Sequence, residues 1–367
     1  MKIICEKEKL SRAIRVVSRA VAAKSNLAAI EGILLVAEND TLTLTGYDFE
    51  MGIKTTIDCR VEREGDVVLP TRLFQNIVRS AEKEDISIDC DMRMNCRIKS
   101  GNANYNIKGI DSAEYPEFPS ANGDTSLKID GSLFTEMCDY VLYAVSTDEK
   151  RPAHTGVQIR VEDDKLIFVA LDGFRLAVCE RRVDFDGNYS LIVPAKTMRE
   201  VRSLAAENEG KISIFASRRY IMFNIGDYIV LSRLLEGDFL DYRKAIPANY
   251  STDVVLNSRS FYDSVERASL IITERLRNPL KLNISENALN VRCNTELGDV
   301  HDAIYVEQTG PDIEIAFNNR YILDALRAAR KDELVFKFSG PLSPCKIVPK
   351  DGDDFVYLVL PVRYKND

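Results

Sequence analysis

The segment VVLPTRLFQNIVRSAEK (67–83) returns twice in related form, as LIVPAKTMREVRSLAAE (191–207) and as EIAFNNRYILDALRAARK (314–331). When the copies are aligned on Pro70, Pro194 and Asn318, each aligned residue lies 124 residues after the one in the copy before it. A repeat of this length is a whole domain rather than a solenoid unit. The sequence therefore predicts three like domains in one chain, each with the same helix in the same place.

Each copy has the pattern of an amphipathic helix with a basic polar side. In the first copy an apolar stripe has helical spacing and comprises Leu73, Phe74, Ile77, Val78 and Ala81. The helical stretches of the three copies, 71–83, 195–206 and 319–331, together hold ten basic and three acidic residues, although the whole chain has a net charge of −8. One sign of charge in three equivalent places predicts a positive surface for nucleic-acid phosphates that does not read bases. The side chains assigned to this DNA-facing surface are Lys24, Arg72, Arg79, Lys83, Lys196, Arg199, Arg202, Arg320, Arg327, Arg330 and Lys331.

The rest of each repeat follows one plan. A first amphipathic helix is expected over residues 7–23, 131–145 and 258–272. Strands with alternating apolar and polar residues follow it, which indicates sheets with one buried face. Two helices and several strands per repeat indicate an α+β fold, with the helices packed on antiparallel sheets. Turn-forming residues near 121–127 and 246–253 place the domain boundaries, so that the predicted domains are 1–124, 125–247 and 248–367.

Composition excludes several classes of protein. The chain has 367 residues, of which 45% are apolar and 29% are charged, as in an ordinary well-cored protein. No apolar run reaches the ~20 residues of a membrane span, and the start MKIICEKEKL has no signal-peptide pattern, so we expect a cytoplasmic protein. Eight scattered cysteines and two histidines form no metal motif, and the cysteines are expected to be small apolar side chains in a reducing compartment. No nucleotide-binding, hydrolase or zinc-protease motif appears, so neither an enzyme nor a cofactor is expected.

Four local motifs strengthen the repeat pattern. They are LDGFRLA (171–177), LLEGDFLDYRKAIP (234–247), FNNRYILDAL (317–326) and YLVLPVR (357–363). In this order, on this triplication, the chain resembles the bacterial sliding-clamp family, the beta subunits of DNA polymerase III, from Met1 to Arg363. The resemblance implies a head-to-tail homodimer whose six domains form a ring around duplex DNA. It also implies a non-catalytic role, in which the ring tethers the polymerase alpha subunit and other factors and a separate clamp loader opens it.

The resemblance also implies a groove that binds a short linear peptide of each partner protein. Transferred residue by residue, the groove would be apolar, with polar groups such as Arg175 and Asn318 fixing the peptide. Leu240 stands where the family often has proline, and Lys244 stands where arginine is common. The residues assigned to the groove are His154, Leu171, Gly173, Arg175, Leu176, Leu240, Lys244, Ala245, Leu276, Asn318, Tyr321, Leu358, Val359, Leu360, Pro361, Val362 and Arg363.

The resemblance further assigns the dimer contact to Tyr105 and Ile107 in the first domain and to Leu270 and Ile271 in the third. Read without it, these four residues are equally compatible with core packing, and LDGFRLA with a plain turn and strand. The basic helices are equally compatible with a solvated charged face. A second function therefore stays open, a protein-interaction scaffold that has the groove but does not encircle DNA.

Overall fold

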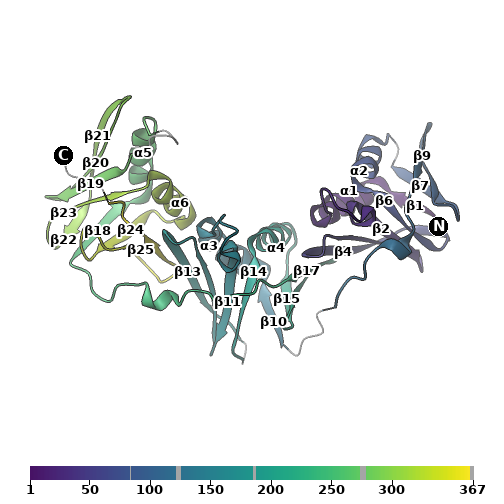
Figure 1. Ribbon diagram of the computed structural model, residues 1–367, viewed down its shortest axis with the longest axis horizontal. Helices are drawn as coiled ribbons and strands as arrows, with labels where there is room; N and C mark the ends of the chain where they lie inside the picture. The colour runs from purple at the N-terminus through teal and green to yellow at the C-terminus, as the bar shows by residue number, and fades with distance from the viewer. Residues whose placement is uncertain (83, 121–124, 185–186, 273–277, 364–367) are drawn as a thin grey trace. The chain divides into compact units, whose positions relative to one another are not determined.

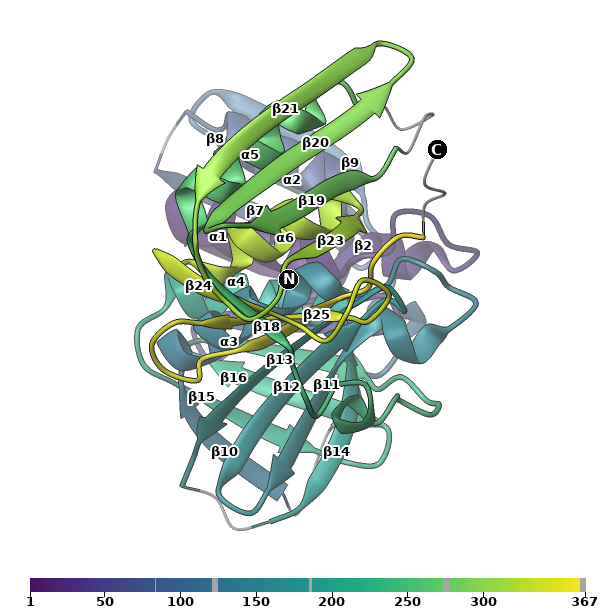
Figure 2. The same ribbon diagram turned by 90° about the vertical axis from the view of Figure 1, so that its left-hand side faces the viewer.

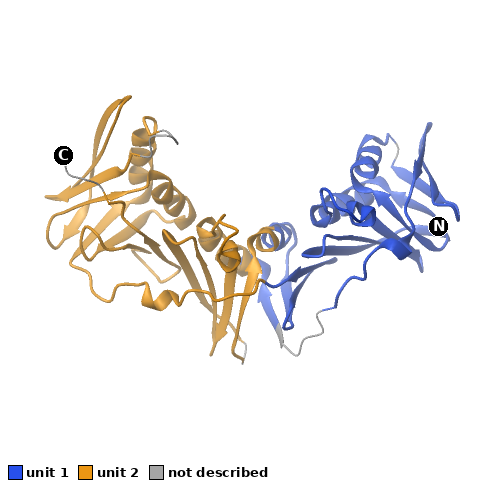
Figure 3. Cartoon of the chain, in the orientation of Figure 1, with its two compact units in different colours: residues 1–132, 200–234 blue, residues 133–199, 235–367 orange. Residues whose placement is uncertain are grey.

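A computed structural model describes residues 1–82, 84–120, 125–184, 187–272 and 278–363. The chain divides into two compact units (Figure 3). Unit 1 comprises residues 1–132 and 200–234, and unit 2 comprises residues 133–199 and 235–367. Each sheet described below lies within one unit.

The α-helices of the described residues occur in three pairs at the repeated positions, as predicted. Their bounds are α1 Lys7–Val17, α2 Thr71–Ser80, α3 Gly131–Val141, α4 Ala195–Glu207, α5 Ser258–Ser269 and α6 Asn319–Ala329. Short 3-10 helices are η1 Ser18–Ala20, η2 Ala28–Glu31, η3 Ser112–Glu114, η4 Leu142–Ala144, η5 Pro152–Thr155 and η6 Tyr242–Lys244. In Figure 1, α1 lies beside α2, and α5 lies beside α6.

Unit 1 contains two antiparallel sheets. The five-stranded sheet has the order β5 (Arg60–Arg63), β1 (Lys2–Glu6), β7 (Asp85–Cys90), β8 (Asn95–Ser100) and β9 (Ala103–Lys108). The eight-stranded sheet has the order β10 (Thr125–Asp130), β15 (Lys211–Ala216), β16 (Tyr220–Ile225), β17 (Tyr228–Arg233), β4 (Met51–Asp58), β3 (Thr41–Tyr47), β2 (Gly32–Glu38) and β6 (Gly65–Pro70).

Unit 2 repeats this arrangement. Its nine-stranded sheet has the order β14 (Tyr189–Pro194), β11 (Gly156–Glu162), β12 (Lys165–Leu171), β13 (Arg175–Arg182), β26 (Val356–Val359), β25 (Cys345–Pro349), β24 (Glu333–Phe338), β18 (Thr252–Asn257) and β22 (Glu307–Thr309). Its four-stranded sheet has the order β21 (Gly298–Tyr305), β20 (Ala288–Thr295), β19 (Leu280–Ser285) and β23 (Ile313–Phe317). Figure 2 shows β19, β20 and β21 side by side at the edge of unit 2.

The two large sheets each combine strands from two sequence repeats. In unit 1, β17 of the second repeat pairs with β4 of the first, with Tyr228 opposite Thr55. In unit 2, β13 of the second repeat pairs with β26 of the third, with Leu176 opposite Leu358. The compact units therefore cut through the second repeat, and the domain boundaries drawn from the sequence stay a prediction.

The amphipathic stripes bury the faces that the sequence predicted, with one exception. On α2, Phe74, Ile77 and Val78 are buried, whereas Leu73 was expected inside and is 46% exposed. Leu73 lies at the margin of the stripe, because each helical residue turns by about 100° and its neighbour Phe74 points to the centre. The stripe on α2 is thus narrower than the sequence suggested.

The expectation that the cysteines are small apolar side chains in a reduced state is wrong for one pair. Cys90 and Cys96 form a disulfide, because they stand directly opposite each other across β7 and β8 with Cα atoms 4.1 Å apart. In the described residues no group of metal-ligating side chains is present. Within the same residues, no helix has both the length and the apolar character that crossing a membrane requires.

Candidate functional site

A groove in unit 2 collects eight of the side chains that the sequence assigned to peptide binding. Its volume is about 90 Å³. The residues that line it are Leu171, Gly173, Phe174, Arg175, Leu176, Leu240, Ala245, Pro344, Leu358 and Leu360. Phe174 and Pro344 were not assigned from the sequence. Phe174 stands inside the motif LDGFRLA and could have been found there, whereas nothing in the sequence near Pro344 marks it.

The floor of the groove is built by strand register. Leu171 of β12 lies opposite Leu176 of β13, and Leu176 lies opposite Leu358 of β26. Because these three leucines are in register on neighbouring strands, they form one continuous apolar row. All three are at most 4% exposed, and they pack in one cluster with Tyr242 and Val178. The floor is therefore part of the core, and only its upper surface can meet a ligand.

A tight turn between β12 and β13 raises one wall of the groove. The carboxylate of Asp172 accepts hydrogen bonds from the backbone N–H groups of Phe174 (2.9 Å) and Arg175 (3.0 Å). Gly173 has φ +93°, a conformation that L side chains rarely adopt. The turn leaves the Phe174 side chain 58% exposed. The turn formed by Asp172 and Gly173 thus places the ring of Phe174 at the rim of the groove.

Arg175 braces this wall against α6. Its Nε donates to Asp172 (3.0 Å), and its Nη1 donates to Asp324 of α6 (2.6 Å). The guanidinium carbon lies 4.7 Å from the ring centroid of Tyr321 and 5.4 Å from that of Tyr143. Burial by itself would lower the pKa of Arg175, but the hydrogen bond to Asp324 and the charge of Asp172 raise it. The side chain is only 12% exposed, so its contacts within the chain dominate.

The rim of the groove is apolar and open. Phe174 stacks on Tyr321 with ring centroids 6.1 Å apart and an interplanar angle of 21°. Leu240 is 50% exposed and Leu360 is 38% exposed. The backbone N–H of Leu360 donates to the carbonyl of Phe174 (2.8 Å), which holds the segment after β26 at the rim. Exposed apolar side chains around an apolar floor are typical of a ligand site.

The other assigned groove residues lie around the groove and do not line it. Asn318 is the N-cap of α6 and accepts a hydrogen bond from the N–H of Arg320 (2.9 Å). The Lys244 side chain is 84% exposed and lies 3.5 Å from Asp241. The backbone N–H of Val362 donates to the carbonyl of Ala316 (2.8 Å), which positions the segment of Pro361, Val362 and Arg363 next to β23, and Val359 is buried in β26.

Two further residues, His154 and Leu276, were also assigned to the groove. His154 lies in η5, with its ring 5.7 Å from that of Phe239, and burial lowers its pKa so that the neutral form is favoured. Its Nδ1 is buried and has no hydrogen-bond partner among the described residues. Leu276 lies outside the residues that the structure describes.

The basic side chains assigned to DNA are largely solvent-facing. Lys83 lies outside the described residues, and Arg202 and Lys331 are half-buried. Exposed members of the set are Lys24, Arg72, Arg79, Lys196, Arg199, Arg320, Arg327 and Arg330. Their exposure fits a positive surface, because a cation that contacts phosphate must reach solvent in the free protein.

Acidic residues partly neutralise the third basic helix. Arg327 lies 3.5 Å from Asp324 and donates to the hydroxyl of Tyr262 (3.0 Å). Arg330 lies 2.7 Å from Asp139, and Lys331 lies 2.5 Å from Asp354. The sequence did not indicate the pairs with Asp139 and Asp354, because these two residues lie outside α6 and far from it along the chain. The positive electrostatic potential around α6 is therefore weaker than its composition suggests.

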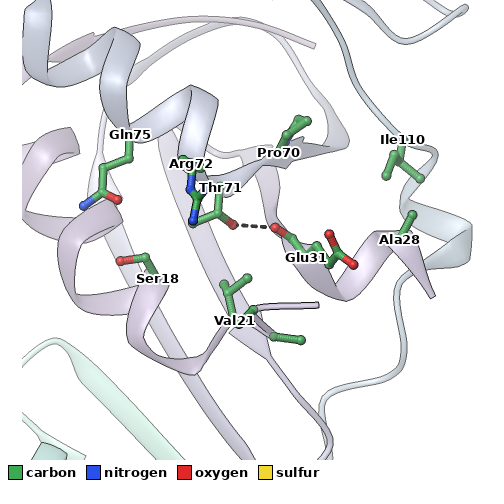
Figure 4. A pocket seen from close by; sticks show the side chains of 11 residues that line it. Ser18, Val21, Ala28, Glu31, Pro70, Thr71, Arg72, Gln75 and Ile110 are labelled. Atoms are coloured by element: carbon green, nitrogen blue, oxygen red, sulfur yellow. Dashed lines mark hydrogen bonds between the residues drawn. The ribbon is translucent and has the colours of Figure 1, made fainter. Parts of the chain in front are cut away.

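A second hollow lies beside α2 in unit 1 (Figure 4). Its volume is about 640 Å³, and Arg72 and Gln75 of α2 line it together with Ser18 of η1 and Glu31 of η2. The hydroxyl of Thr71 donates to the carbonyl of Glu31 (2.9 Å), which ties α2 to η2. The hollow places Arg72 beside the loop that contains the exposed Lys24, both of which were assigned to DNA.

The residues assigned to the dimer contact lie at or near open sheet edges. Tyr105 and Ile107 are half-buried on β9, which has no partner strand on its outer side in the described chain. Leu270 is 82% exposed just after α5, and Ile271 next to it is half-buried. β21 is the edge of the four-stranded sheet. Open edges present unpaired backbone groups that another chain can pair with.

Comparison with known proteins gives one family over almost the whole chain. Family models of the DNA polymerase III beta subunit match its N-terminal domain at residues 1–119, its central domain at 128–241 and its C-terminal domain at 243–363. A beta sliding clamp of Staphylococcus epidermidis is 30% identical over 356 residues, which cover 94% of each chain. The DNA polymerase sliding clamp of Bacillus subtilis has a TM-score of 0.96 at 29% identity, over 100% of both chains. A sliding clamp of Bartonella birtlesii solved bound to griselimycin has a TM-score of 0.93 at 26% identity, covering 99% of this chain and 100% of that one.

Proposed function

Since the chain belongs to the DNA polymerase III beta subunit family, the non-catalytic sliding clamps, we propose that it acts as a ring-shaped homodimer around duplex DNA. In this function the ring tethers the replicative polymerase and other factors to DNA and thereby gives processivity. Its partners are the polymerase alpha subunit, the clamp loader and further proteins with clamp-binding linear peptides. It works in the cytoplasm, where the bacterial chromosome is replicated.

The groove of unit 2 is the observation that supports partner binding most strongly. It combines an apolar floor of Leu171, Leu176 and Leu358 with an open rim that exposes Phe174 and Leu240. A short peptide with leucine and aromatic anchors fits such a surface, because apolar pockets supply affinity while backbone groups set the orientation. The solved relative bound to griselimycin shows that a member of this fold family takes a ligand.

Peptide titration tests this proposal. A fluorescent pentapeptide, Gln-Leu-Ser-Leu-Phe, is expected to bind saturably, and Arg175→Ala is expected to weaken binding about tenfold, or ~1.4 kcal/mol. The loss is indirect, because removing the guanidinium leaves Asp172 and Asp324 unpaired and frees the stack of Phe174 on Tyr321. Fluorescence anisotropy measures the dissociation constant.

Arg182→Ala is the matched control for that titration. Arg182 lies on the same strand, β13, but its side chain is 85% exposed. Its Nε comes no closer than 3.7 Å to the carboxylate of Asp164. An exposed pair of this kind contributes little, so peptide affinity should stay unchanged. Equal weakening by both substitutions, or no binding by the intact protein, would contradict a peptide-binding role for the groove.

The exposed cations of α2, α4 and α6 support the encirclement of DNA. Arg72, Lys196 and Arg320 occupy the same position in the three repeats, and Arg79 matches Arg327, so like domains place positive charge on the like helix three times. Contacts of this kind hold phosphates without reading sequence and weaken with salt, which suits a protein that must slide.

The homodimer is expected to join the β9 edge of one protomer to the α5–β21 region of its partner. Head-to-tail contacts of this type close into a ring when the rotation permits. Ile271→Glu should weaken the dimer on the order of a hundredfold, because it places a carboxylate in an apolar contact. Sedimentation velocity at micromolar concentration then shows monomers.

Leu342→Glu is the control for the dimer experiment. Leu342 is 68% exposed in the loop between β24 and β25, away from the assigned contact residues in sequence, and its substitution should leave a dimer. An unchanged dimer mass for Ile271→Glu would remove Ile271 from the interface.

A scaffold that binds peptides without encircling DNA is the second candidate function. The pairing of Arg327, Arg330 and Lys331 with Asp324, Asp139 and Asp354 favours it, because paired cations attract phosphate less strongly. Charge reversal of the basic helices separates the two functions, since a scaffold would lose nothing by it.

A further inference from the structure

Two cysteine pairs occupy equivalent positions in the five-stranded sheet of unit 1. Across β7 and β8, Cys90 stands directly opposite Cys96, and the two are bonded. Across β1 and β5, Ile3 lies opposite Val61 and Ile4 lies opposite Arg60. The same antiparallel register continued by one residue places Cys5 opposite Cys59. One cysteine pair therefore stands opposed at the end of the β7–β8 ladder, and a second follows one residue beyond the end of the β1–β5 ladder.

The second pair is held in place by the turn between β2 and β3. The backbone N–H of Cys59 donates to the carbonyl of Asp40 (3.0 Å). The N–H of Val61 donates to the carboxylate of the same residue (3.1 Å). These bonds fix the chain where it leaves β4 and enters β5. The two thiols are close enough for each to shift the pKa of the other, and neither is in a disulfide.

The two thiols differ in exposure. Cys5 is 1% exposed, whereas Cys59 is half-buried and reaches solvent. With this arrangement, the accessible sulfur can react with a small disulfide in solution. The buried sulfur can then attack the mixed disulfide that results. The other four free cysteines are buried, and three of them, Cys179, Cys293 and Cys345, stand opposite Phe168, Val300 and Val359.

We propose that Cys5 and Cys59 are a thiol-modification site that closes to a reversible cross-strand disulfide, with Cys59 as the sulfur that reacts first with low-molecular-weight disulfides such as oxidised glutathione. The Cys59 thiolate attacks one glutathione sulfur, which forms a mixed disulfide and releases one glutathione thiolate. The Cys5 sulfur then attacks the Cys59 sulfur and releases the second glutathione. The two cysteines lose two electrons and two protons, and oxidised glutathione gains them as two molecules of glutathione.

The electrostatics of the pair agree with this order of reaction. The hydrogen bond with Cys5 lowers the pKa of Cys59, although burial and the charges of Asp40 and Asp58 act in the opposite direction. The same hydrogen bond, followed by burial, raises the pKa of Cys5. Both shifts favour the thiolate at the accessible sulfur, where nucleophilic attack is possible.

The bond would fasten the outermost strand to its sheet. β5 is the edge strand, and β1 lies between β5 and β7. A Cys5–Cys59 disulfide would join β5 to β1 as the Cys90–Cys96 disulfide joins β7 to β8. Disulfides in reducing compartments are mostly transient and redox-sensing, so a pair poised between the two states fits a protein of the bacterial interior.

The test uses the intact protein in glutathione buffers of increasing oxidised fraction. Non-reducing peptide mass spectrometry should detect the Cys5–Cys59 cross-link, and excess reduced glutathione should remove it. Cys5→Ala should instead accumulate glutathione on Cys59, because the second attack is no longer possible. Brief alkylation by iodoacetamide should modify Cys59 about tenfold faster than Cys179, which is the matched buried control.

Three results would overturn the proposal. The first is stable glutathione on Cys59 in the intact protein without a cross-link, which would show that Cys5 cannot reach it. The second is equal alkylation rates at Cys59 and Cys179 in the native protein. The third is a Cys5→Ala variant that has native circular dichroism and acquires no glutathione at Cys59.

Discussion

Replacing Arg79, Arg199 and Arg327 with glutamate is expected to lower affinity for duplex DNA on the order of a thousandfold at low salt. Each arginine is exposed on α2, α4 or α6, so each reversal removes one attraction for phosphate and adds one repulsion. Fluorescence anisotropy with a duplex, repeated over a range of salt concentrations, measures the affinity and its salt slope. The slope should become shallower, because fewer counterions are released.

A matched variant reverses Arg97, Arg182 and Arg292, which are exposed arginines on β8, β13 and β20. It has the same net charge as the helix variant and the same number of substitutions. If the helices face DNA, the strand variant keeps most of the affinity and both variants bind the pentapeptide normally. Equal losses in the two variants would show that only overall charge matters, and no loss in either would favour the scaffold function.

Leu358→Ala is expected to lower the free energy of unfolding by about 2–5 kcal/mol. Leu358 is 4% exposed and lies between Leu176 and the rest of the apolar cluster beneath the groove, so alanine leaves a cavity in the core. The same substitution removes the floor of the groove, and peptide binding should fall with stability. Urea unfolding followed by tyrosine fluorescence suits this chain, which has no tryptophan.

Leu360→Ala is the comparison two residues further along. Its side chain is 38% exposed at the rim, so the cost in stability should be within about 1 kcal/mol. Peptide affinity should nevertheless fall, because the rim loses an anchor contact. A large stability loss for Leu360→Ala, or none for Leu358→Ala, would contradict the division of the groove into a buried floor and an open rim.

Much of the fold could be predicted from the sequence, because its signals are local. The 124-residue step, the helical stripes and the strand alternation each depend on residues close together in the chain. Helix α6 begins at Asn319 after the cap Asn318, where the pattern of apolar residues starts. Eight of the residues assigned to the groove through the family motifs also line one hollow, and their role in peptide binding stays a prediction.

Contacts between distant segments could not be predicted in this way. Pro344 precedes β25, which reaches the groove because its neighbour β26 pairs with β13 of the second repeat, and no local pattern predicts that pairing. Arg175 was expected to meet a peptide, but Asp324 lies 149 residues away in the chain and binds it from α6. Cys90 and Cys96 are only six residues apart, but their pairing depends on the strand register of β7 and β8, which spacing alone does not give.

The sequence by itself therefore determined the triplication, the helix pair of each repeat, the antiparallel α+β class and the location of basic charge. Only the tertiary structure decided that the large sheets combine strands of two repeats, which acidic residues pair with the basic helix α6, and which cysteines stand opposite one another. The physical reason is the distance along the chain over which each kind of interaction acts. Periodicity and turn chemistry act over a few residues, whereas register, ion pairs and thiol contacts depend on how segments far apart in the chain are brought together.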